Sequence, residues 1–236
     1  LFHSLGYAVV NDFEIPDVYT IPDSIDNLEP EQRGNWQATR QVSAKIKDLI
    51  ELLVTSDADI EVLDNISNSL DSAVAALENS PRYFGKVDYL ENGPYQSFSD
   101  VSHELSPLSG LSNPLSPPVK IEVKDGKASG SVFCGWAYEG PPGTVHGGFV
   151  AAIFDQFLGM AQMIGKQPGM TGRLIVHYHA RSPLNKELQL KAWLERVDGR
   201  KTIIHGEMFD GDNKTASCEG LFIAPKNGVH MLRPLE

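Results

Sequence analysis

Residues 143–164 read GTVHGGFVAAIFDQFLGMAQMI. Beyond the glycine pair, apolar residues occupy nearly every turn and every face, which predicts a helix that is buried all round. Asp155 is the one carboxylate in this stretch, and burying an unpaired carboxylate is costly. The helix starts at Gly147 and Gly148, where free backbone N–H groups and the positive end of the helix dipole favour negative charge. Function is therefore expected at Asp155 and at this N-terminus.

Runs with strand-like patterning flank the helix on both sides. Three Asp-Gly dipeptides separate neighbouring runs, and such turns join antiparallel strands. The order is two strands, the helix, and four further strands. One antiparallel sheet is then available to cover the helix, so we expect an α+β fold in which the sheet wraps around it. The runs are 119–124, 127–133, 171–181, 187–197, 200–209 and 214–224.

Two amphipathic helices are expected near the N-terminus. Apolar residues recur at helical spacing over residues 41–53, with Trp36 extending the stripe, and again over residues 60–77. They should form an antiparallel hairpin docked on the remainder of the chain. Because the hairpin contains no catalytic motif, we expect it to be dispensable for chemistry. The predicted boundaries are 1–91 for this helical extension, 92–118 for a Ser/Pro-rich connecting segment lying extended along the surface, and 119–236 for the α+β domain.

Composition and charge exclude several classes of function. The chain has 236 residues and a net charge of −11, and its first 100 residues alone carry −12, which argues against nucleic-acid binding. A basic segment followed by an apolar run is absent from the first residues, and Asp155, Gln156 and Gln162 interrupt the apolar helix, so neither a secretion signal nor a membrane span is expected. Cys134 and Cys218 lack metal or redox spacing, which indicates buried free thiols in a reducing cytoplasm.

Several short motifs then point to a family. They are Gly140-Pro-Pro-Gly-Thr-Val-His146-Gly-Gly, Asp155 nine residues after the histidine, Gly159-Met160, Met170-Thr171, Tyr178, Arg181-Ser-Pro183 and Asp198-Gly-Arg-Lys201. Together with the strand order of a hot-dog fold, they resemble the acyl-CoA thioesterases of the phenylacetic-acid-degradation type. The branch of mammalian thioesterase superfamily members that act on long-chain acyl-CoA is nearest. The resemblance covers about residues 119–225.

This resemblance implies hydrolysis of a fatty or aryl acyl-CoA to the free acid and CoA, without a cofactor or a metal. It implies Asp155 as base or nucleophile, the amide of Gly147 or Gly148 as the oxyanion site, and Thr171 as the group that assists the water or the aspartate. Some relatives carry an Asn six residues before the histidine. This chain has Gly140 there, so any role of that Asn does not transfer.

The residues alone lead to a similar chemistry. A thioester carbonyl at the helix N-terminus would be polarised by preorganised N–H groups, each worth about 3 kcal/mol of barrier in other enzymes. A thiol has a pKa of about 8.5, so the leaving group needs no strong general acid. Asp155 can either deprotonate water or attack directly. His146 either shapes the start of the helix or hydrogen-bonds near the carbonyl.

Helix geometry predicts that two chains share the site. Asp155 is seven residues beyond Gly148, which places it about 10 Å along the helix axis, whereas both groups must approach one reacting carbon. The aspartate should therefore come from a two-fold related copy, in a homodimer or a dimer of dimers. Strand 171–181 would pair with its symmetry mate, with Tyr178 inward and His177 and His179 near the two-fold axis.

Two rival functions stay open at this point. A non-catalytic acyl-CoA binding module could use the same fold, although it would not need Asp155. A hydratase or dehydratase would need a histidine and a carboxylate on one substrate, yet His146 and Asp155 are separated by about 13 Å along the helix. The histidine pair of strand 171–181 lacks a third metal ligand. Arg200 and Lys201 are candidate contacts for CoA phosphates.

Overall fold

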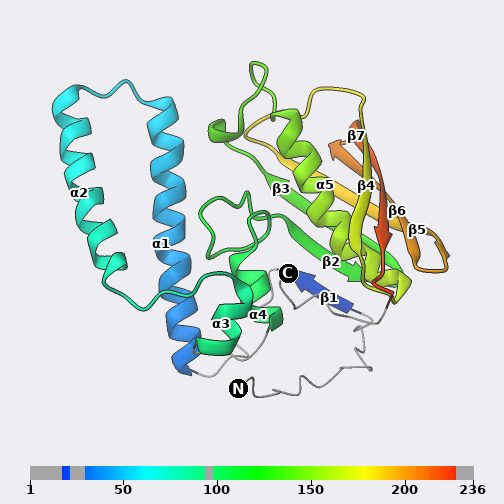
Figure 1. The fold of residues 1–236 in the computed structure, drawn as a ribbon. Helices are drawn as coiled ribbons and strands as arrows, with labels where there is room; N and C mark the ends of the chain where they lie inside the picture. The colour runs from blue at the N-terminus through cyan, green and yellow to red at the C-terminus, as the bar shows by residue number, and fades with distance from the viewer. Residues whose placement is uncertain (1–17, 22–29, 94–97, 227–236) are drawn as a thin grey trace, which may run out of the picture.

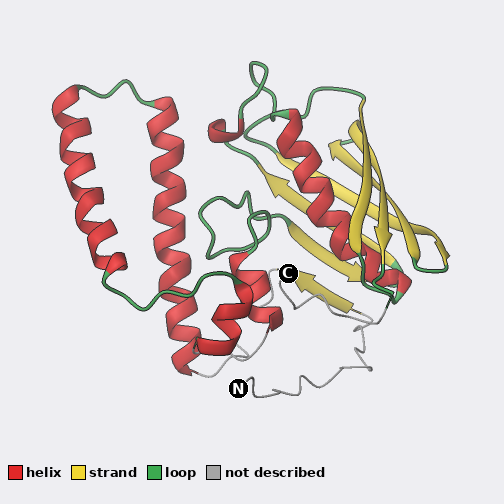
Figure 2. Cartoon of the chain, in the orientation of Figure 1, coloured by secondary structure: helices red, strands yellow, loops and turns green. Residues whose placement is uncertain are grey.

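The computed structural model describes residues 18–21, 30–93 and 98–226. Its centre is a hot-dog fold, as predicted: an antiparallel sheet with one long helix, α5, lying against it (Figures 1 and 2). The seven strands run in the order β1-β2-β3-β5-β6-β7-β4. Their bounds are β1 (Val18–Ile21), β2 (Lys120–Lys124), β3 (Lys127–Phe133), β4 (Met170–Tyr178), β5 (Glu187–Asp198), β6 (Lys201–Asp210) and β7 (Asn213–Ile223).

Six of these strands are the predicted ones, and the turns between them explain why. Asp125 and Gly126 both have positive φ (50° and 71°), the geometry of a two-residue hairpin turn that matches the twist of the flanking strands. Strand β1 was not predicted from the sequence. It pairs antiparallel with β2, so four residues from the N-terminal part of the chain extend the sheet at that edge. Strand β4 forms the opposite edge.

Helix α5 (Gly147–Ala161), continued by the 3₁₀ turn η3 (Gln162–Gly165), differs from the prediction of burial on all sides. Its buried residues recur at i, i+3, i+4 and i+7 and face the sheet: Val150, Ile153, Phe154, Phe157, Leu158 and Ala161. Asp155 is exposed on the opposite face. The sheet curves around only one side of the helix, so the other side of an otherwise apolar helix stays open in a single chain. By length and composition alone, residues 147–165 would suffice to cross a membrane, but here they pack on the sheet.

The N-terminal helices form the predicted antiparallel hairpin. Helix α1 (Pro30–Thr55) lies between α2 (Ile60–Glu78) and the hot-dog fold (Figure 1), and the Asp59 carboxylate caps α2 by accepting the N–H of Val62 at 3.1 Å. Only α1 docks on the remainder, because α2 has no buried residue. The apolar face of the hairpin is consequently exposed over Leu52, Leu53, Val54, Ile60, Val62, Val74 and Leu77.

Two short helices, α3 (Lys86–Asn92) and α4 (Phe98–Leu105), hold the base of α1. Trp36 is buried against Val101, with Tyr89 and Leu105 around them. Beside this cluster, the Arg40 guanidinium forms an ion pair with the buried Glu104 carboxylate, which also accepts the Ser112 hydroxyl at 2.5 Å.

The connecting segment does not lie extended along the surface as predicted. After α4 it folds into a series of turns whose serine side chains are buried at positions 106, 109, 112 and 116. Ser106 shows why: its Oγ accepts the backbone N–H groups of Leu108 and Ser109, both at 3.3 Å. Serine hydroxyls that bond backbone two or three residues on stabilise turns, so this composition packs tightly.

Candidate active site

His146 forms the N-cap of α5, with φ −57° and ψ 131°. Its Nδ1 accepts the N–H of Gly148 at 3.0 Å, which places the ring proton on Nε2 in the neutral imidazole. The side chain therefore satisfies one of the N–H groups that the first turn of a helix leaves without a partner. This contact is the one expected if His146 shapes the start of the helix.

Gly147 is the first residue of α5, and its backbone N–H is available to a ligand. Among the described residues, no group accepts its N–H, whereas the N–H of Gly148 is taken by the His146 ring. The Gly147 carbonyl accepts the hydroxyl of Tyr178 at 2.8 Å, so a side chain from β4 orients this peptide. Tyr178 is 57% exposed, but its side chain is on the inner face of the sheet with Leu174 and Val176, as predicted, and its ring lies against the turn at Gly147.

The side chains of Asp155 and Thr171 meet across α5 and β4, and the family resemblance implied that Thr171 assists either the water or the aspartate. The Thr171 hydroxyl donates to Oδ1 of Asp155 at 2.8 Å, and both side chains are exposed. A register shift between Thr171 and Arg173, at Gly172, interrupts the β4–β7 ladder next to this contact. Bulges of this kind re-aim a side chain, here the threonine hydroxyl onto the helix. The second oxygen, Oδ2, has no partner among the described residues and is free to accept a proton or attack a carbonyl.

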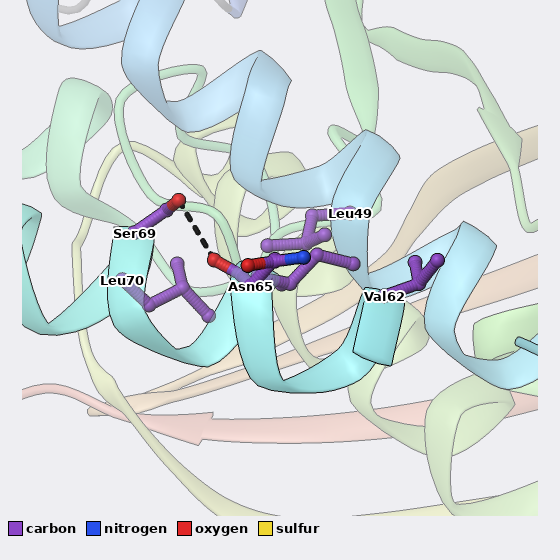
Figure 3. Close-up of a pocket in the computed structure, with 6 residues that line it drawn as sticks. Leu49, Val62, Asn65, Ser69 and Leu70 are labelled. Carbon is purple, nitrogen blue, oxygen red and sulfur yellow. Dashed lines mark hydrogen bonds between the residues drawn. The ribbon is translucent and has the colours of Figure 1, made fainter. Parts of the chain in front are cut away.

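These two half-sites are not brought together within one chain. Asp155 lies seven residues beyond Gly148 on the same straight helix, about 10 Å along its axis. Asp155 is exposed on the face of α5 opposite the sheet, whereas Gly147 is at the start of the helix, partly exposed beside Tyr178. A groove of about 430 Å³ exists elsewhere, between α1 and α2, lined by Leu49, Val62, Asn65, Ile66, Ser69 and Leu70 (Figure 3). It contains no acid or base, so it is not a candidate for the chemistry.

The loop before His146 is closely packed on the turn. The Tyr138 carbonyl accepts the His146 N–H at 2.9 Å, and Gly140 lies so close that a Cβ there would be 2.7 Å from the His146 Cα. The glycine at the position where some relatives carry Asn therefore leaves no room for any side chain. Burial, with smaller contributions from Cys134 and Glu51, raises the pKa of Tyr138 to about 12, so this phenol stays neutral.

The other candidates have structural partners. His177 and His179 stack with ring centroids 6.5 Å apart, and His179 hydrogen-bonds the Ser217 hydroxyl at 2.8 Å. Arg200 donates to the Ala224 carbonyl at 2.6 Å, which occupies one of its nitrogens at the end of β7. Cys134 and Cys218 are buried free thiols, as predicted, and burial raises the pKa of each to about 12.

One cluster on the outer face of the sheet has metal-like geometry. The ligand atoms of Glu195, His205 and Glu219 lie within 4.8 Å of one another. However, Arg173 pairs with Glu219 at 2.9 Å, and Arg196 and His205 both pair with Glu195. Because cations of the protein already neutralise both carboxylates, ion pairing accounts for the cluster.

Comparison with known proteins agrees with the fold. The model of the Thioesterase superfamily matches residues 142–217, which include His146, Asp155 and Thr171. A thioesterase superfamily protein of known crystal structure is 31% identical, with a TM-score of 0.67, and the match covers 78% of this chain and 94% of that protein. Residues 119–236 make up half of the chain, so this match also includes part of the N-terminal helices.

A curated relative carries a named activity. Acyl-coenzyme A thioesterase THEM4 of Mus musculus is 33% identical over 100 residues, which make up 41% of this chain and 43% of the mouse protein. The chain therefore aligns with less than half the length of that relative.

Proposed function

The chain belongs to the thioesterase superfamily, and from that premise we propose that it hydrolyses the thioester of a fatty or aryl acyl-CoA to a free acid and CoA. The observation that carries this proposal is the Asp155–Thr171 contact at 2.8 Å on the open face of α5, together with the unpartnered N–H of Gly147 at the start of the same helix. A non-catalytic binding module would not need the Asp155 carboxylate that the Thr171 hydroxyl orients.

The proposed reaction assigns one role to each group. The Gly147 N–H donates to the thioester oxygen, on which negative charge develops as the tetrahedral intermediate forms. Oδ2 of Asp155 either removes a proton from the attacking water or itself attacks the carbonyl carbon, while Thr171 holds Oδ1. The carbon–sulfur bond then breaks and CoA leaves as the thiolate, which requires no strong acid from the protein. If Asp155 is the nucleophile, this step leaves a mixed anhydride on Asp155, and water then hydrolyses it to the free acid and regenerates the carboxylate.

We further propose that each site combines Asp155 of one chain with Gly147 of a two-fold related copy. The separation of about 10 Å along one helix supports this, because both groups must reach the same carbon within about 3 Å. The face of α5 that the sheet does not cover supports it as well, and so does the outer edge of β4, which has no partner strand among the described residues, since a second copy would cover both.

The test is a thiol-release assay with acyl-CoAs from short to long chain and with aryl acyl-CoAs. Asp155→Asn should lower turnover by roughly 10²-fold or more while the protein stays folded, because it removes the base or nucleophile. Thr171→Val is the companion variant and should lose less, since it only frees Oδ1. Absence of thiol release by the wild type on every thioester would favour the acyl-CoA binding module, and normal turnover by a folded Asp155→Asn protein would remove Asp155 from the mechanism.

A further inference from the structure

Glu51, on α1, reaches from the helical hairpin to the loop that precedes the candidate site. Its Oε1 accepts the N–H of Trp136 at 2.7 Å, and its Oε2 accepts the N–H of Ala137 at 3.0 Å. These two N–H groups open the 3₁₀ turn η2 (Trp136–Tyr138), whose N-cap, Gly135, provides no side-chain hydrogen bond. One carboxylate thus satisfies two donors at once, and hydrogen bonds to a charged acceptor are stronger than neutral ones.

Gly135 makes room for this contact. A Cβ at that position would lie 2.6 Å from Oε2 of Glu51, so any side chain there would displace the carboxylate. No backbone atom is among the nearest contacts of that Cβ, so the rest of the loop would tolerate it. Within the described residues, η2 is also the part of the hot-dog fold with which α1 has its main contact.

A short segment of chain connects the Glu51 contact with the candidate oxyanion site. Beyond η2, the Tyr138 carbonyl accepts the His146 N–H, Glu139 forms a β-bridge with Val145, and Gly140 abuts the His146 Cα. The next peptide carries the Gly147 N–H. A single short segment therefore lies between the Glu51 carboxylate and the turn whose amide must point at the thioester oxygen.

We propose that Glu51 is a positioning residue for the thioesterase reaction: by holding η2, it sets the orientation of the 146–148 turn. This inference rests on the proposed function and replaces the expectation that the hairpin is dispensable for chemistry. The Gly147 N–H is a donor that acts mainly on the charged transition state. Misalignment of such a donor lowers kcat more than it changes KM. Displacements of about 1 Å, even from changes distant from the chemistry, can cost up to about 10²-fold.

The experiment compares Glu51→Ala with Asp48→Ala in the full chain. Asp48 lies on the same helix, is exposed, and has no interaction with the described residues, so its removal is a matched loss of one carboxylate. Glu51→Ala should lower kcat on the order of 10-fold with KM nearly unchanged, and Asp48→Ala should leave both within about 2-fold. Glu51→Gln retains one acceptor oxygen and should fall between wild type and Glu51→Ala. Gly135→Ala should reproduce the loss of Glu51→Ala by displacing its carboxylate.

Amide hydrogen exchange provides a readout that does not depend on catalysis. In Glu51→Ala, exchange at Trp136 and Ala137 should accelerate by about 10-fold, with a smaller acceleration at His146, and Asp48→Ala should show neither. Faster exchange with unchanged kcat would overturn the positioning role, and unchanged exchange would overturn the contact itself. If the wild type releases no thiol from any acyl-CoA, the proposed function fails, while exchange at His146 still decides whether Glu51 orders the turn.

Discussion

The sequence does not distinguish Gly147 from Gly148 as the candidate oxyanion donor. The structure does distinguish them, by the partner of each backbone N–H. Gly148 gives its N–H to the His146 ring, whereas the N–H of Gly147 has no acceptor among the described residues. The difference arises because an N-cap side chain reaches the second or third helical N–H, not the first. The first amide of the helix is therefore the one that remains for a ligand.

This distinction gives a matched pair of variants at Gly147. Proline removes the N–H yet is favoured at the first position of a helix, and the ψ of 131° at His146 suits a residue that precedes proline. Alanine keeps the N–H, and its Cβ would meet Tyr178 at 3.4 Å, an ordinary contact. We expect Gly147→Pro to lower kcat by about 10²- to 10³-fold and Gly147→Ala to lower it less than about 5-fold, measured by thiol release. Equal activities of the two variants would show that another donor holds the oxyanion.

At the residue scale, the sequence was informative about which residues are candidates for the site. It was less informative about the burial and the partners of their side chains. The family resemblance implied that Thr171 assists either the water or Asp155, and the structure shows the Thr171 hydroxyl bonded to the Asp155 carboxylate. The burial of Asp155 could not be read from the same pattern, since an apolar helix face looks alike whether its own sheet or a second chain covers it. Glu51 was not predicted at all: a lone glutamate on an amphipathic helix has no local signal for a partner 85 positions away.

At the scale of elements, α1 is tied to α4 by a buried ion pair. Glu104 is 5% exposed and accepts from both Arg40 and Ser112. Removing one partner of a buried pair leaves an uncompensated polar group, so Glu104→Ala should lower the free energy of unfolding by about 3 kcal/mol. Glu187→Ala is the control, because its pair with Lys120 is exposed and should contribute less than about 0.5 kcal/mol. Urea unfolding followed by circular dichroism measures both, and similar losses would mean that the ion pair does not anchor α1.

The elements were largely predictable where local chemistry dominates. Asp-Gly turns located three hairpins and periodicity located α1, α2 and α5. Strand β1 and the turns of the connecting segment were not predicted, because β1 depends on pairing with β2 and the turns on the hydrogen bonds of Ser106 and Ser112, and the partners of β1 and of Ser112 come from the tertiary structure. Amphipathicity likewise predicted the hairpin but not which helix would be covered, and α2 turned out to have no buried residue.

At the scale of the whole molecule, the proposal that two chains share each site predicts that two inactive variants can complement each other. Asp155→Asn chains and Gly147→Pro chains are each expected to be nearly inactive. When they are unfolded and refolded together, about half of the dimers should be mixed, and each mixed dimer should contain one intact site, so about a quarter of wild-type activity should return. No recovery in verified mixed dimers would place both groups of a site in the same chain. Refolding each variant alone is the control and should restore nothing.

The two margins of the sheet have unequal lengths: nine residues in β4 and four in β1. A sheet with two long unpaired edge strands can pair with a further copy at each edge. Repeated addition of that kind produces fibrils. When two copies join through β4 about a two-fold axis, the long margin of each is consumed. What remains at either end of the joined sheet is a four-residue strand, too short to serve as an effective template. In a dimer of this kind, strand-by-strand polymerisation would terminate after one step, because the edges left among the described strands are the two short β1 strands.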